Sequence, residues 1–154
     1  MIAGDTIVGL RLRRFGQEAA REWFRVALPS HDVAASPLPT DVYWDFTDVS
    51  LSPDGRHIAY VADAGKLAPQ AVVRQFPAGA VVVRGPRAEG CECDVDHNHA
   101  RWVSSDSFEV AVVNSAASDA NAPPWLVTVG RVNPPRQRTV GLPNEPRWHE
   151  APQR

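Results

Sequence analysis

Hydrophobic and polar residues alternate near the start of the chain. Val8, Leu10 and Leu12 are separated by Gly9 and Arg11 within residues 6–15. Successive side chains of a β-strand point to opposite faces, so a period of two indicates a strand with one buried face. We therefore predict a half-buried strand at residues 6–15.

The period changes after Gly16. Apolar residues now recur at the spacing of one helical stripe, namely Ala20, Trp23, Phe24, Ala27 and Leu28. Arg21 and Arg25 take the positions on the opposite side of such a helix. This pattern predicts an amphipathic helix that packs through Trp23 and Phe24 and ends at Pro29.

The rest of the chain is predicted to be β-structure. Residues 30–40, rich in Pro and Ala, form a connector, and short apolar runs bounded by turn residues follow. These runs predict eight strands, at residues 42–51, 57–62, 71–76, 80–84, 99–104, 108–114, 125–131 and 138–142. The last residues, 143–154, form a tail over the surface.

An internal repeat organises the β-region. Residues 51–61 align without a gap on residues 103–113, at a constant offset of 52 residues. Each copy consists of an apolar residue, Ser, a small turn residue, Asp, and a run that ends in apolar–Ala–apolar–apolar. In the first copy, Pro53 presets the backbone for a type I turn, and Asp54 and Gly55 suit its later positions.

Two further strands follow each copy, so each repeat is predicted to be a four-stranded antiparallel meander. We expect a single domain over residues 1–154, with a strand, helix and linker at 1–40, a first repeat at 41–90 and a second at 91–142. The fold class is therefore mainly β, with one N-terminal strand and one amphipathic helix.

The run from Ser52 to Val61 resembles the strand–turn–strand signature of blades in TolB-like and WD40-like β-propellers. The resemblance covers residues 42–142 and implies blade-like units without implying an activity, because that family includes scaffolds, periplasmic components and non-catalytic domains of peptidases. No Trp-Asp pair closes either repeat, as a strict WD40 repeat would require.

Two repeats are fewer than the four to eight blades that usually close a propeller. Three arrangements remain open: two sheets packed as a sandwich, a propeller completed by self-association, and a partial propeller completed by another chain.

Charge and composition narrow the function. The chain carries a net charge of −2 and has a pI near 6.2, so neither nucleic acid nor a membrane is an expected partner. Its apolar runs are too short for a membrane span, and its first arginines follow the apolar residues, opposite to a secretory signal. With Cys91 and Cys93 only two positions apart, a cytoplasmic location is the simplest prediction.

The loop between the repeats contains metal-ligating residue types. Cys91, Cys93, His97 and His99 lie within nine residues, and thiolates with imidazoles are the ligands that Zn²⁺ prefers. The spacing is tighter than the usual C-x₂₋₄-C and H-x₃₋₅-H pairs. We therefore keep a zinc site, and a metal-binding or metal-dependent enzyme function, as the alternative hypothesis, and otherwise expect no cofactor.

Aromatic and loop residues suggest an interaction surface instead. Tyr43, Trp44 and Phe46 follow one another so closely that a strand would direct them to both faces, which favours partial exposure. Residues 115–124, with Asp119 and Asn121, form a long loop, and long loops are often functional.

No nucleophile elbow, phosphate loop or zinc-protease motif is present in the sequence. The leading hypothesis is therefore a non-enzymatic protein–protein interaction module whose partner is another protein or a second copy of the chain.

Overall fold

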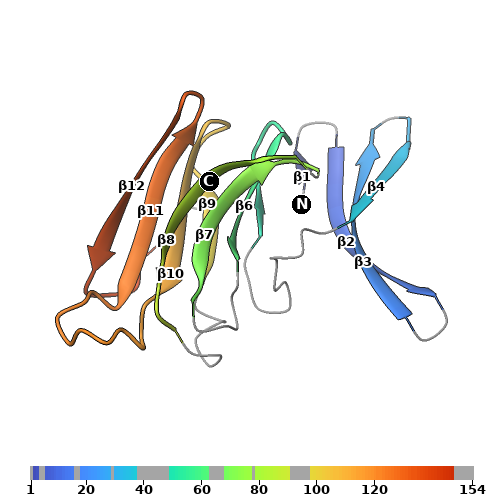
Figure 1. Ribbon diagram of the computed structural model, residues 1–154. Coiled ribbons are helices and arrows are strands. Elements are labelled where there is room, and N and C mark those ends of the chain that lie inside the picture. Colours follow the sequence, from blue (N-terminus) through green and yellow to red (C-terminus); the bar gives the residue numbers. More distant parts are fainter. Residues whose placement is uncertain are drawn as a thin grey trace.

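A computed structural model describes residues 2–3, 6–15, 18–28, 30–37, 49–62, 68–77, 79–90 and 98–147. These residues contain twelve β-strands and no helix, arranged as three four-stranded antiparallel sheets (Figure 1). Within each sheet the strands are neighbours in chain order. The protein is thus mainly β, as predicted.

The first sheet contains β1 (Ile2–Ala3), β2 (Thr6–Phe15), β3 (Glu18–Ala27) and β4 (Val33–Pro37). The strand predicted at 6–15 is confirmed as β2. The helix predicted at residues 20–28 is wrong, because these residues form β3, which pairs antiparallel with β2 and β4.

The reason for this difference lies in the residues beside the apolar stripe. Phe15 pairs with Glu18, so only Gly16 and Gln17 separate the two strands. A Gly-X pair is the sequence that two-residue hairpin connections favour, and Trp, Phe and Val at 23, 24 and 26 prefer strands. Pairing with β2 on one side and β4 on the other outweighs the helical period.

The second sheet contains β5 (Ser50–Leu51), β6 (His57–Ala62), β7 (Gln70–Gln75) and β8 (Val81–Arg87). The third contains β9 (His99–Trp102), β10 (Ser107–Val113), β11 (Trp125–Val132) and β12 (Pro135–Leu142). The two predicted meanders are therefore confirmed. Of the strand predicted at 42–51, only β5 is seen, because residues 42–48 lie outside the described residues.

The repeated turn is built around a serine in both copies. Ser52 Oγ accepts hydrogen bonds from the backbone amides of Arg56 (3.2 Å) and His57 (3.0 Å). Ser104 Oγ accepts from those of Asp106 (3.3 Å) and Ser107 (3.0 Å). Because these short polar side chains replace missing backbone partners, the same Ser-x-Asp pattern produces a tight reversal twice.

The main core lies between the second and third sheets, and it joins unlike faces of the two repeats. The second sheet contributes Ala59 and Val61, and the third contributes Val110 and Val112, all buried. At the repeat offset of 52, Val110 and Val112 correspond to Ile58 and Tyr60, which lie in a separate cluster on the other face of the second sheet. The sheets therefore stack in the same sense, as successive blades do, whereas the two halves of a symmetric sandwich would join equivalent faces.

Two hydrogen bonds connect these sheets at opposite edges. Trp102 Nε1 on β9 donates to the carbonyl oxygen of Ser50 on β5 at 2.9 Å. Gln137 Nε2 on β12 donates to the carbonyl oxygen of Arg84 on β8 at 2.8 Å. Both edges of the stack are thus fixed by a side chain of the third sheet.

Within the third sheet, Phe108 and the backbone of Arg136 approach Gly130 closely. A Cβ at position 130 would collide with the carbonyl oxygen of Arg136 and lie 2.7 Å from Phe108 Cζ. We expect Gly130→Ala to lower the free energy of unfolding by about 2 kcal/mol, because Phe108 is buried and cannot yield without disturbing the core. Urea unfolding followed by tryptophan fluorescence measures this change.

Gly90→Ala is the matched control, since a Cβ there would meet no atom closer than 3.3 Å. It should change the free energy of unfolding by less than about 1 kcal/mol. Equal destabilisation by the two substitutions would contradict the packing of Phe108 over Gly130.

Candidate functional site

The face of the third sheet that points away from the second sheet carries both charged side chains and an apolar cluster. Directly paired residues of neighbouring strands share a face, so the register places side chains in rows across β9, β10, β11 and β12. One row is Arg101, Glu109, Val129 and Arg138. We call this surface the outer face.

One end of the outer face is apolar and covered. Ala111, Val113, Trp125 and Val127 form a buried cluster there. The His99 ring stacks on Trp125, with centroids 6.3 Å apart and an interplanar angle of 7°.

The chain after β12 returns to this covered end. Glu145 Oε1 lies 3.1 Å from His99 Nε2, and the next residue, Pro146, is buried. Because β12 and β9 are opposite edges of the sheet, residues 143–147 cross from one edge to the other. Residues 143–147 thus lie against the outer face beside Trp125.

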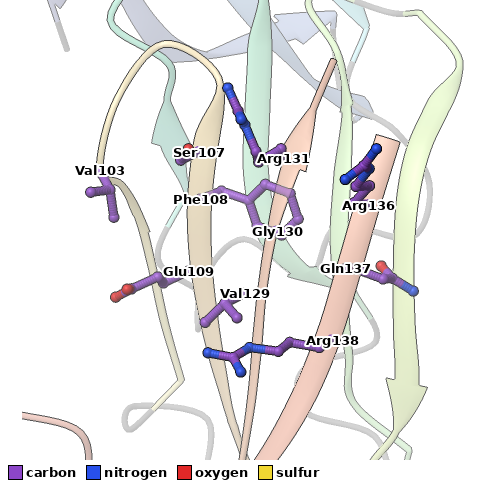
Figure 2. A pocket seen from close by; sticks show the side chains of 10 residues that line it. All are labelled: Val103, Ser107, Phe108, Glu109, Val129, Gly130, Arg131, Arg136, Gln137 and Arg138. Atoms are coloured by element: carbon purple, nitrogen blue, oxygen red, sulfur yellow. The ribbon is translucent and has the colours of Figure 1, made fainter. Parts of the chain in front are cut away.

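The other end of the outer face is open and forms a hollow of about 430 Å³, which we call the outer groove (Figure 2). Ten residues of β10, β11, β12 and the β9–β10 connection line it. They are Val103, Ser107, Phe108, Glu109, Val129, Gly130, Arg131, Arg136, Gln137 and Arg138. In Figure 2 the Arg138 side chain reaches from β12 across β11, beside Val129.

Two of the charged groups around the groove are neutralised by ion pairs. Arg101 Nε donates to Glu109 Oε2 at 2.7 Å, and its Nη2 lies 2.5 Å from the same oxygen. Arg131 Nε donates to Asp106 Oδ2 at 2.6 Å. Both pairs are partly exposed, so they position side chains more than they stabilise the fold.

Arg136 and Arg138 differ from these arginines. Both are exposed, and within the part of the chain that the structure describes neither forms an ion pair or a side-chain hydrogen bond. They lie on the same face of β12, two residues apart. Among the described residues, the groove therefore carries two guanidinium groups without a partner.

Asp106 fixes the end of the groove. Besides its bond to Arg131, its Oδ1 accepts from the backbone amide of Asn133 at 2.8 Å, and its carbonyl oxygen accepts from the amide of Val132 at 2.9 Å. The repeated turn of the third sheet is thereby joined to the β11–β12 hairpin.

These contacts also set the charge state of Asp106. Desolvation, the largest single influence, raises the pKa of its carboxyl group. The Arg131 hydrogen bond, backbone amides and the positive charge of Arg131 together outweigh it, so the pKa lies below its ordinary value of 3.8.

Only one of the four predicted metal ligands, His99, is among the described residues, so the predicted metal site stays untested. Cys91, Cys93 and His97 lie outside the described residues. His99 is engaged with Glu145 and Trp125. Among the residues that are described, no group of three or more His, Cys, Asp or Glu side chains is arranged to hold a metal ion.

The predicted interaction residues are described only in part. Tyr43, Trp44 and Phe46 lie outside the described residues. Asp119 and Asn121 are exposed and bond each other, since Asp119 Oδ1 accepts from the Asn121 backbone amide at 2.9 Å. This loop joins β10 to β11 at the end of the sheet opposite the groove, and its interaction role stays a prediction.

Sequence reasoning missed the outer groove. The last strand was predicted to begin at residue 138, whereas β12 begins at Pro135. The available signal was the alternation of Arg136, Gln137 and Arg138 directly after two prolines, which is typical of a charged edge strand.

The chain is similar to solved structures but not to a known family model. No family model matches it, and no curated protein does. Two solved structures are similar: TolB from Acinetobacter baumannii, at 15% sequence identity, and the acylaminoacyl peptidase from Pyrococcus horikoshii, at 10%, each with a TM-score of 0.46. The matches cover 90% and 91% of this chain but 30% and 24% of those chains, so this chain spans less than a third of either.

The second and third sheets, each a four-stranded antiparallel meander, fit blade-like units as the sequence predicted. Among the described residues, no helix is long and apolar enough to cross a membrane.

The lowered pKa of Asp106 predicts a pH-dependent stability. The unfolded carboxyl group binds a proton near pH 3.8 and the folded one only at lower pH, so its contribution is present above that pH and is lost as the pH falls through the folded pKa. We expect Asp106→Asn to be less stable than wild type at pH 7, and the difference to shrink below about pH 4.

Urea unfolding at pH 7, 5 and 3 tests this expectation, with Asp119→Asn as a variant that loses the same charge without losing an ion pair. A difference between wild type and Asp106→Asn that is unchanged at pH 3 would show that the carboxylate charge is not what ties the turn to the hairpin.

Proposed function

We propose that the chain is a non-enzymatic protein interaction module that holds a partner protein in the outer groove. The observation that carries this proposal is an open hollow with two arginines that have no partner among the described side chains, beside an apolar end that is already covered. Arginine is enriched in protein interfaces because its planar group binds carboxylates and also packs on apolar surface.

The construction of the groove supports a binding role. Its floor is formed by paired strands rather than by a loop, so the side chains are held by the sheet ladder. Val103, 61% exposed, adds an apolar contact at the rim. A fixed surface with apolar and charged contacts loses little conformational entropy when it binds.

The charges of the groove favour binding over acid–base chemistry. Glu109 and Asp106 are each engaged by an arginine, and the contacts of Asp106 hold the pKa of its carboxyl group below the ordinary value. Blade-like sheets serve many roles, so this proposal depends on the groove rather than on the fold.

Site-specific photocrosslinking tests the proposal. p-Benzoylphenylalanine at Val103 should capture one protein in stoichiometric amounts from cells that produce the chain. The same group at Val33, which is 59% exposed on β4, should not. Arg136→Gln with Arg138→Gln should abolish the capture at Val103.

Arg56→Gln in the β5–β6 connection with Arg87→Gln on β8 removes the same charge away from the groove and should leave capture unchanged. Equal capture at positions 103 and 33, or capture that survives loss of Arg136 and Arg138, would contradict a partner site in the outer groove.

A further inference from the structure

We infer that the partner presents an extended acidic segment to the outer groove, with carboxylates at alternate positions that bind Arg136 and Arg138. This inference rests on the proposed interaction function and adds the chemistry and conformation of the ligand. Three observations support it: the charge of the outer face, the spacing of Arg136 and Arg138, and the shape of the groove.

The charge of the outer face predicts a negatively charged ligand. The outer face carries Arg101 and Arg131, which are paired with Glu109 and Asp106, and then Arg136 and Arg138, which have no counterpart among the described residues. The open end of the face therefore has an excess of positive charge although the whole chain has a net charge of −2. A carboxylate is the group that guanidinium binds with two parallel hydrogen bonds.

Spacing decides the conformation of the ligand. Alternate residues of a strand lie about 7 Å apart on one face, so this is the separation of the Arg136 and Arg138 backbone positions. Alternate side chains of an extended peptide have the same repeat. An extended segment that lies in the groove parallel to β12 therefore places residues i and i+2 opposite the two arginines.

Shape argues against a helix. Val129 is a short side chain between the longer Glu109 and Arg138 of the same row, so the hollow lies over β11, and the Arg138 side chain reaches across part of it (Figure 2). Two strand spacings span about 10 Å between these flanking backbones, and the flanking side chains narrow that width further. A helix with its side chains is about 10–12 Å across, whereas an extended backbone fits.

A second copy of the chain is the weaker candidate for this surface. Stacking another sheet on the outer face in the way the third sheet stacks on the second would bury Arg136 and Arg138. Burying charged groups without partners is strongly unfavourable because they lose their hydration. An acidic segment supplies these partners, so its charge complements the groove.

The test uses the purified full chain and a defined probe. The probe is a fluorescein-labelled eight-residue peptide in which Glu and Ser alternate, and binding is followed by fluorescence anisotropy at 50 mM salt. We expect it to bind at least fivefold more tightly than the same peptide with Gln in place of Glu. It should also bind more tightly than a peptide with four Glu followed by four Ser, which has the same charge without the alternation.

Variants locate the site. Arg136→Gln with Arg138→Gln should weaken binding of the alternating peptide at least fivefold, whereas Arg56→Gln with Arg87→Gln should change it less than twofold. Glu109→Gln should tighten binding, because it removes the carboxylate that repels the ligand from the same row. Circular dichroism and urea midpoints establish that each variant is folded.

Three results would overturn the inference: equal affinity for the Glu and Gln peptides, equal affinity for alternating and blocked Glu, or unchanged binding after loss of Arg136 and Arg138. The photocrosslinking at Val103 is independent of the probe. If that capture depends on the two arginines while the acidic peptide fails to bind, the interaction function holds and the acidic extended ligand is wrong. If the peptide binds at these arginines and no protein is captured, the proposed function is wrong.

Discussion

The packing of unlike faces between the second and third sheets is the constraint on which the rest of the structure depends. Ala59 and Val61 of one sheet meet Val110 and Val112 of the other, and each of these four residues is almost completely buried. Because equivalent faces of the two repeats do not meet, the contact does not close on itself. Among the described residues, it leaves the outer face of the third sheet without a second sheet packed against it.

The outer face carries an apolar cluster at one end and charged side chains at the other. The stretch nearest Trp125 is apolar and is closed by His99, Glu145 and the segment that carries it. Beyond Val127, the rows change from aliphatic to charged residues, and the surface opens into the groove. The equivalent face of the second sheet packs in the main core against the third sheet, so it is not open in the way the outer face is.

The parts of this fold that could be predicted are those with a local cause. The strand at His57–Ala62 follows from a Ser-Pro-Asp-Gly turn and a short apolar run. The helix expected over Trp23 and Phe24 is wrong although the apolar spacing is helical, because pairing with β2 and β4 outweighs that period. The groove depends on which residues of four strands share a row, and register across non-adjacent segments is not encoded in any one of them.

The equivalent aspartates of the two repeats, Asp54 and Asp106, make different contacts. Asp54 stays within its own turn, where Ser52 Oγ donates to it at 2.6 Å. Asp106 instead binds Arg131 and the amide of Asn133 on the neighbouring hairpin. The first turn joins strands with six residues between Leu51 and Ile58, and the second with five between Trp102 and Phe108, so the constant offset in sequence does not preserve the register. In the second turn the aspartate bonds Arg131 of β11 and so holds one end of the groove in place. The arginines of β12 are then the groups that the proposed acidic ligand would meet.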